Sequence, residues 1–147
     1  MAHFRRLIRS DLPPATVFAA VLDLQGHTEV VPFTQSSTTD GRPVGENSEL
    51  LGLTRIGPLT VRDTMTVIEF RPPGDGRAGY CLLVKTGRVV LGWIELSVSD
   101  SGLGGSVLRW EQEISISHLP RLFDPLLGPV AGLGYGFALH RLLRRAR

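Results

Sequence analysis

The sequence predicts an α+β fold in which a curved antiparallel sheet of about seven strands wraps round one long C-terminal helix. Three observations predict it. Apolar residues recur at helical spacing through residues 117–147. Six segments with strand-like alternation precede that helix and are joined by short loops rich in Gly and Pro. One further strand and two short helices are expected before them.

The first elements are expected as a strand at residues 3–9 and two short helices at residues 15–24 and 27–31. Six strands follow, at residues 34–39, 46–55, 59–70, 80–86, 89–99 and 106–117. Short loops between consecutive strands favour an antiparallel meander. No linker or internal repeat interrupts the order, so residues 1–147 are expected to form a single domain.

The C-terminal helix contains two prolines, Pro125 and Pro129. Each removes a backbone donor, so we expect a short first piece and a main piece that begins near Leu126 or Pro129. The uncharged part, residues 125–139, is shorter than the roughly 18–20 apolar residues that a bilayer requires. No integral membrane segment is therefore expected.

Glycines recur along the same helix at Gly128, Gly132 and Gly136. This stripe without side chains either lets the helix pack closely on the sheet or leaves space for a ligand. Close packing is the interpretation that we favour.

Alternation within each strand predicts which side chains face the helix. In residues 106–117 one set is charged and is assigned to solvent, so the opposite set faces inward. In residues 80–86 the same reasoning turns Lys85 outward and places Cys81 on its side. The predicted ligand-binding residues are inward side chains of the sheet and two residues of the helix: Met65, Val67, Leu82, Val84, Ile94, Leu96, Leu108, Trp110, Gln112, Leu133 and Phe137.

Composition and motifs argue against several classes of function. The net charge is only +2, so no nucleic-acid partner is expected. The single cysteine excludes an internal disulfide, and the four dispersed histidines lead us to expect no metal. No dinucleotide fingerprint is present and no cofactor is expected. The absence of a nucleophile elbow argues against nucleophilic catalysis. The N-terminus lacks the apolar region of a signal peptide, which favours a cytoplasmic location.

Asp63 and Tyr135 are the candidate acid–base residues. The strand phase turns Asp63 inward, where a carboxylate needs a partner, and Arg55 across the nearby turn is the partner we expect. The alternative, which we favour, is a one-residue bulge that leaves Asp63 in solvent. Tyr135 either donates a proton or is a core residue with its hydroxyl at the rim. Gln112 either orients a ligand or is a satisfied core amide.

Several short motifs carry a family resemblance. Residues 12–18, Leu-Pro-Pro-Ala-Thr-Val-Phe, and residues 92–96, Gly-Trp-Ile-Glu-Leu, are two of them. A third is residues 105–111, Gly-Ser-Val-Leu-Arg-Trp-Glu. Together they resemble the helix-grip START-like (SRPBCC) superfamily of polyketide cyclases and dehydrases, lipid-transfer proteins and coenzyme Q-binding relatives. The resemblance spans nearly the whole chain and implies a hydrophobic tunnel between the curved sheet and the C-terminal helix.

Three functions follow from these expectations. In the first, the protein carries or sequesters a hydrophobic small molecule of lipid, polyketide or isoprenoid type. In the second, it is a polyketide aromatase, cyclase or dehydrase that uses Asp63, Tyr135 and Gln112 in the same cavity. In the third, the cavity is closed and the domain only binds a partner. The sequence leaves open whether the protein is an enzyme and whether it forms a homodimer.

Overall fold

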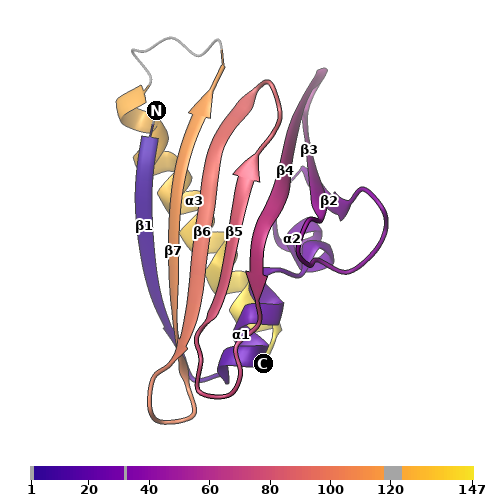
Figure 1. Cartoon of the computed structure of the whole chain (residues 1–147). Helices are drawn as coiled ribbons and strands as arrows, with labels where there is room; N and C mark the ends of the chain where they lie inside the picture. Colours follow the sequence, from indigo (N-terminus) through magenta and orange to yellow (C-terminus); the bar gives the residue numbers. More distant parts are fainter. Residues whose placement is uncertain (1, 32, 118–123) are drawn as a thin grey trace.

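A computed structural model describes residues 2–31, 33–117 and 124–147. The expected order of one strand, two short helices, six strands and one long helix is confirmed (Figure 1). The elements are β1 (Ala2–Ser10), α1 (Pro14–Val21), α2 (Leu24–Val30), β2 (Thr34–Thr38), β3 (Glu49–Ile56), β4 (Leu59–Arg71), β5 (Gly79–Lys85), β6 (Val90–Asp100), β7 (Ser106–Ile116) and α3 (Asp124–Arg145).

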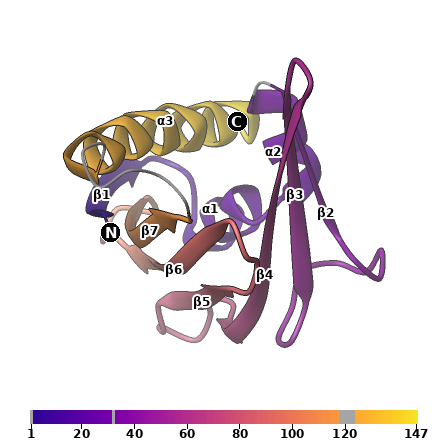
Figure 2. The ribbon, with the colours of Figure 1, turned by 90° about the horizontal axis from the view of Figure 1, so that it is seen from above.

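The seven strands form one antiparallel sheet in the order β1-β7-β6-β5-β4-β3-β2. The sheet does not close, because β1 and β2 lie at opposite edges. Seen from above, the β5–β7 part and the β2–β4 part of the sheet face in different directions, with α1 and α3 on the concave side (Figure 2). This is the curved sheet wrapped round a C-terminal helix that the sequence predicts.

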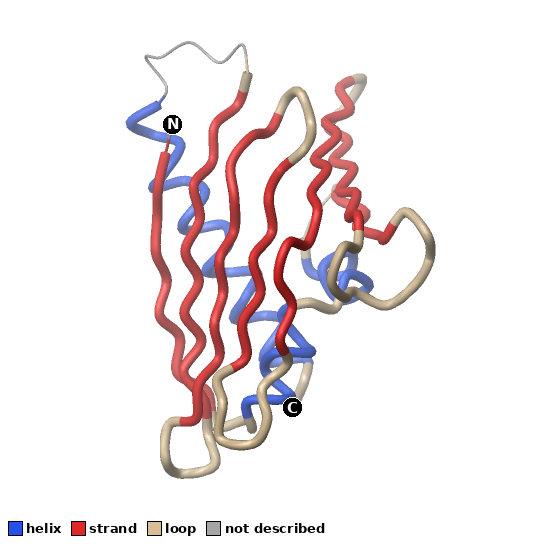
Figure 3. Tube along the Cα trace, in the orientation of Figure 1, coloured by secondary structure: helices blue, strands red, loops and turns tan. Residues whose placement is uncertain are grey.

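Two irregularities help the sheet to curve. Gly92 in β6 has a φ of 130°, and a Cβ atom there would lie 1.9 Å from the carbonyl oxygen of Glu113 in β7. Only glycine allows the two strands to approach so closely. A β-bulge between Val67 and Glu69 shifts the register of β4 against β5. The strands accordingly bend along their length (Figure 3).

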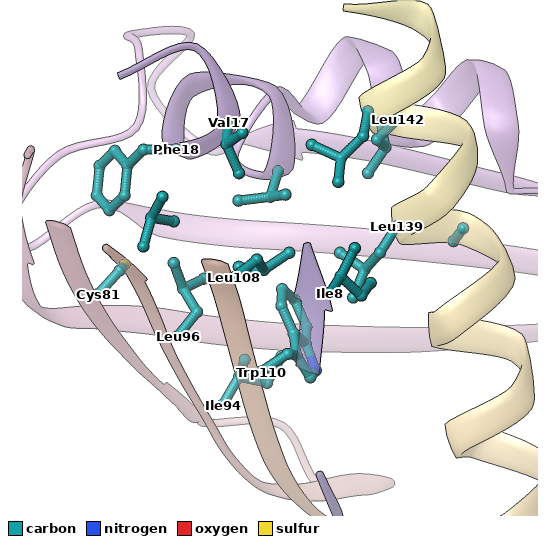
Figure 4. Close-up of a cluster of buried hydrophobic side chains, with 14 of the residues drawn as sticks. Ile8, Val17, Phe18, Cys81, Ile94, Leu96, Leu108, Trp110, Leu139 and Leu142 are labelled. Atoms are coloured by element: carbon teal, nitrogen blue, oxygen red, sulfur yellow. The ribbon is translucent and has the colours of Figure 1, made fainter. Parts of the chain in front are cut away.

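The hydrophobic core fills the end of the sheet that α1 covers. Figure 4 shows Val17 and Phe18 of α1 facing Leu96 and Leu108 of the sheet, with Leu139 of α3 beside them. These five side chains are almost completely buried, with 0–4% of their surface exposed. Burial of one such side chain stabilises the fold by about 1.5–3 kcal/mol.

Helix α3 is continuous from Asp124 to Arg145, although Pro129 lies inside it. It therefore begins two residues before Leu126, close to where the main piece was expected. The short first piece was expected largely over residues 118–123, which lie outside the described residues. None of the helices in the described ranges has the length and hydropathy needed to cross a bilayer.

Two glycines of α3, Gly132 and Gly136, face β1. A Cβ atom at Gly132 or Gly136 would lie 3.1 or 3.3 Å from the guanidinium group of Arg6. Arg6 Nε also donates a hydrogen bond of 2.9 Å to the carbonyl oxygen of Gly132. These contacts support the close-packing interpretation of the stripe at both positions.

The predicted faces of β4, β6 and β7 agree with the structure, but that of β5 is wrong. Val84 is 37% exposed on the outer face, and Leu82 points the same way. The inward residues of β5 are Cys81, Leu83 and Lys85, with 0%, 3% and 6% of their surface exposed. Both faces of this strand are apolar, so only the charge of Lys85 decided the prediction, and that charge is buried.

Candidate functional site

A cavity of about 460 Å³ lies between the sheet and the helices α2 and α3. It adjoins the core and shares several residues with it, among them Val21, Ile94 and Trp110, but most of its wall comes from α2, β2, β3, β4 and the middle of α3. Most of its wall is apolar, from Val21, Leu22, Leu24, Val30, Val31, Leu50, Leu51, Met65, Leu83, Ile94, Trp110, Ala131, Tyr135, Phe137 and Ala138.

Small residues keep this space open. Gly52 of β3 and Ala131 and Gly134 of α3 all lie on the wall. A Cβ atom at Gly134 would have no neighbour within 4 Å. Arg145 at the end of α3 holds α2 in place, because its guanidinium nitrogens lie 3.0 Å from Asp23 Oδ2 and 2.8 Å from Glu29 Oε2. Helix α2 thereby covers the cavity without filling it.

The polar part of the wall is a small group of side chains: His27, Thr34, Ser36, Thr54 and Asp63. The hydroxyl oxygens of Thr34 and Thr54 lie 2.9 Å apart and share a hydrogen bond across β2 and β3. The cavity therefore combines a largely apolar wall with a polar side near β2–β4.

His27 is neutral and has a fixed tautomer. Its Nε2 lies 2.8 Å from the carbonyl oxygen of Val21, which can only accept, so Nε2 carries the proton. Burial lowers the pKa of His27 below its ordinary value, and this outweighs the Val21 hydrogen bond and the charge of Asp23, which raise it.

Asp63 lies on the cavity wall in a regular ladder with Gly52, so the favoured bulge into solvent is wrong. Asp63 forms an ion pair with Lys85, not with the expected Arg55. Lys85 Nζ donates to Asp63 Oδ2 at 2.6 Å. The Lys85 side chain has no exposed surface, whereas the Asp63 side chain is 24% exposed. Arg55 is itself exposed near the end of β3. A buried ammonium group is tolerated here because a carboxylate on the neighbouring strand compensates its charge.

One oxygen of Asp63 has unused capacity. Oδ1 is shielded from solvent and accepts no hydrogen bond within the described part of the chain. The residue opposite Asp63 on β3 is Gly52, which has no side chain to cover the carboxylate. The second carboxylate oxygen therefore has no protein partner there.

Tyr135 also lies on the wall, packed between two other aromatic rings. Its ring centroid is 5.8 Å from that of Phe4 and 5.6 Å from that of Trp110. The Nε1 of Trp110 donates a hydrogen bond of 3.2 Å to Gln112 Oε1. Gln112 is fully buried, and its Nε2 has no partner among the described residues. Gln112 thus lies behind Trp110 and orients that ring.

The predicted site residues fall into three groups. Asp63 and Tyr135 line the cavity, together with four of the predicted binding residues: Met65, Ile94, Trp110 and Phe137. Inward side chains that belong to the core are Val67, Leu96, Leu108 and Gln112. Residues that face away from the cavity are Leu82, Val84 and Leu133, of which Leu133 is 70% exposed on α3. The role in binding stays a prediction for the residues on the wall.

The sequence analysis missed the wall formed by α2, β2 and β3. Thr34 and Ser36 are two residues apart in β2, as are Gly52 and Thr54 in β3, so each pair lies on one face of its strand. This spacing could have predicted that the four residues share one face of the sheet. Polar residues on that face concealed it. In the described ranges, no three His, Cys, Asp or Glu side chains come together as ligands of a metal ion.

Solved structures share this fold. The Zhui aromatase/cyclase from Streptomyces sp. R1128 has a TM-score of 0.70 at 13% identity, over 98% of this chain and 92% of that chain. A START superfamily protein from Mycobacterium smegmatis has a TM-score of 0.68 at 16% identity, over 99% and 97%. A norcoclaurine synthase point mutant from Thalictrum flavum has a TM-score of 0.64 at 12% identity, over 97% and 94%. At these identities the likeness shows the fold alone.

The fold is thus the helix-grip fold of START-like proteins. Residues 1–147 match the family described as "Polyketide cyclase / dehydrase and lipid transport". The chain belongs to this family, which confirms the resemblance drawn from the sequence motifs. No curated protein sequence matches the chain.

Proposed function

We propose that the protein binds a hydrophobic small molecule, of lipid, polyketide or isoprenoid type, in the cavity between the sheet and α3, and carries or sequesters it. The observation that carries the proposal is the cavity itself. Its volume of about 460 Å³ lies in the range of roughly 300–1,000 Å³ typical of small-molecule sites. Family membership agrees with such a role.

The physical basis is the contrast between the wall and water. Most of the wall consists of aliphatic and aromatic side chains, so an apolar occupant gains about 25 cal/mol for each Å² of apolar surface that it removes from water. The small residues Gly52, Ala131 and Gly134 leave the space, and no side chain has to move to make it. A largely preformed apolar site of this kind is what the binding of a hydrophobic small molecule requires.

A binding titration with N-phenyl-1-naphthylamine, a neutral apolar fluorophore, tests the proposal. The wild-type protein should bind one molecule per chain with a blue-shifted emission. Ala131→Trp, which adds an indole to the wall, should abolish this binding. Leu133→Trp, on the same helix but 70% exposed and away from the cavity, is the matched control and should bind as the wild type does.

The proposal fails if Ala131→Trp, shown to be folded by circular dichroism, binds the probe as tightly as the wild type. It also fails if the wild type shows no saturable binding. If the cavity does bind the probe, native mass spectrometry of the protein purified from its own host identifies the class of ligand, because a copurified molecule adds its mass to that of the chain.

A second candidate is a polyketide aromatase, cyclase or dehydrase. The observation that favours it is the presence of two proton-carrying groups, Asp63 and Tyr135, on one apolar wall. In that case a poly-β-keto thioester incubated with the protein should lose water, seen as a mass decrease of one water molecule. Tyr135→Phe should slow that loss without weakening the binding of N-phenyl-1-naphthylamine.

Other expectations from the sequence stay predictions. They are a cytoplasmic location, the absence of a nucleic-acid partner and the option of a homodimer. They concern the location, the partners and the oligomeric state of the protein, and none of them changes the test of the cavity.

A further inference from the structure

We propose that the cavity selects ligands that carry a hydroxyl group, an alcohol or a phenol, and that this hydroxyl donates a hydrogen bond to the carboxylate of Asp63. The inference rests on the proposed binding function and adds the polar chemistry of the ligand to it. Asp63 is the anchor, and Lys85 is a positioning residue behind it.

The carboxylate has acceptor capacity that the protein does not use. A carboxylate can accept about four hydrogen bonds. In the described residues Asp63 accepts one side-chain bond, from Lys85 Nζ to Oδ2 at 2.6 Å, and Oδ1 accepts none. An unpaired buried oxygen of this kind is costly, so a donor that reaches it is strongly favoured.

The carboxylate is also within reach of the cavity. The Asp63 side chain lies on the wall and is 24% exposed, although Oδ1 itself is shielded. The last torsion of an aspartate side chain has a broad minimum, so a small rotation can turn Oδ1 toward the cavity while Oδ2 stays bonded to Lys85. Gly52 lies opposite on β3, where a Cβ atom would touch Asp63 at 3.6–3.8 Å. Any larger residue at position 52 would cover this approach.

The ion pair sets the charge of the anchor. Lys85 has no exposed side-chain surface, so its ammonium group cannot itself meet a ligand. It fixes one oxygen of Asp63 and makes the pair neutral as a whole. A neutral hydroxyl can therefore bind to Asp63 without repulsion from Lys85, whereas a cationic ligand would bring a second positive charge next to the Lys85 ammonium group. A ligand carboxylate would face the Asp63 carboxylate and be rejected.

Several of the neighbouring polar groups are already bonded within the protein, and none of them carries a negative charge. The hydroxyls of Thr34 and Thr54 are hydrogen-bonded to each other. His27 uses Nε2 on the carbonyl of Val21. Of the polar side chains on the described wall, Asp63 is the one with a charged acceptor that is only partly used, so it contributes most to selectivity.

Two probes of the same ring system test this inference: 2-naphthol, which carries a hydroxyl donor, and 2-methoxynaphthalene, which does not. The wild-type protein should bind 2-naphthol about tenfold or more tightly, the usual effect of a hydrogen bond to a charged group. In ¹³C NMR of the wild type, the carboxyl resonance of Asp63 should shift with 2-naphthol and stay in place with 2-methoxynaphthalene.

The variant removes the whole pair, because removal of the carboxylate alone would leave a buried ammonium group unpaired. Asp63→Val combined with Lys85→Met should bind both probes with similar affinity, close to that of 2-methoxynaphthalene for the wild type. Thr66→Val, on the same strand as Asp63 but outside the cavity wall, is the matched control and should keep the preference for 2-naphthol.

The outcomes separate the two proposals. Equal affinities in the wild type, with no shift of the Asp63 resonance, overturn the anchor and leave binding in the cavity intact. Binding of neither probe overturns the proposed function and the anchor with it. A tenfold preference that persists in the double variant overturns the role of Asp63. The wild-type NMR measurement decides the question even if the double variant does not fold.

Discussion

The two ends of the interior share one sheet and one C-terminal helix but are covered differently. At one end α1 inserts Val17 and Phe18 between the strands and α3, and the interior is solid. At the other end α2 lies over β2–β4, and a cavity of about 460 Å³ remains. The small residues Gly52, Ala131 and Gly134 line the cavity, whereas Leu96 and Leu108 occupy the closed end.

The two ends also differ in the polar groups that they tolerate. The closed end buries Cys81, and burial raises the pKa of its thiol to about 12, so it stays a neutral packing group. The open end holds the Asp63–Lys85 ion pair and the neutral His27. The comparison teaches that the covering helix and the size of a few side chains, rather than the sheet, decide which end can bind a ligand.

The largest effect is expected at the ion pair of the open end. Asp63→Ala should lower the free energy of unfolding by about 3–5 kcal/mol, because it leaves the fully buried Lys85 ammonium group without a partner. Asp63→Val combined with Lys85→Met should recover most of that loss. Denaturation with urea measures both. An Asp63→Ala variant as stable as the wild type would mean that water reaches Lys85 and that its side chain is not fully buried in solution.

The next effect compares equivalent truncations at the two ends. Leu108→Ala should cost about 3 kcal/mol, because Leu108 is 0% exposed and its removal creates a void in the closed core. Met65→Ala should cost about 1 kcal/mol, because Met65 already borders open space. Urea denaturation of both variants tests this. Equal losses would contradict the distinction between a solid end and an open one.

The sequence predicted the architecture because its signals are local and consistent. Alternation in residues 106–117, with charge on one face, gives the correct inward set of β7, including Leu108 and Trp110. The order of elements follows from turn residues and periodicity. In β5 the same reasoning failed, because Lys85 faces inward to Asp63 on the neighbouring strand. A contact between strands is not visible in the pattern of one strand.

The cavity was harder to predict than the fold. Phe137 and Leu133 both fit an apolar helix face and are 59% and 70% exposed, yet Phe137 borders the cavity and Leu133 does not. Their positions depend on how α3 is rotated on the sheet, which packing decides. The contribution of α2 depends on where the helix sits above β2 and β3, and ion pairs of Arg145 help to set that position. Such tertiary distances leave no periodic signal in the chain.

A smaller effect should appear as a dependence of stability on pH at the open end. Burial lowers the pKa of His27 in the folded protein below its ordinary value of 6.5. As the pH falls below 6.5, His27 therefore takes up a proton more readily in the unfolded chain than in the folded protein. The free energy of unfolding should therefore keep its full value above pH 6.5 and decrease as the pH falls below 6.5. His27→Gln, followed by thermal denaturation from pH 7.5 to 5, should flatten this dependence.

A matched control for His27 lies on the outer face of the sheet. Hydrogen bonds from His3 and Arg5 lower the pKa of Glu111, so the stability that it contributes is lost only as the pH falls below its ordinary value of 4.5. Glu111→Gln should leave in place the fall in stability below pH 6.5 that His27→Gln removes. If His27→Gln has the same pH dependence of stability as the wild type, the folded protein does not oppose protonation of His27.

The smallest effect compares two glycines of α3, one on the cavity and one on β1. Gly134→Ala should raise the free energy of unfolding by about 0.5–1 kcal/mol, because alanine favours the helix and its methyl group enters open space. Gly132→Ala gains the same helix propensity but brings a methyl group to 3.1 Å from Arg6, which donates to the carbonyl of Gly132. Its gain should be smaller or negative in the same urea denaturation series. Equal gains would mean that Arg6 moves aside freely and that α3 does not depend on close contact with β1.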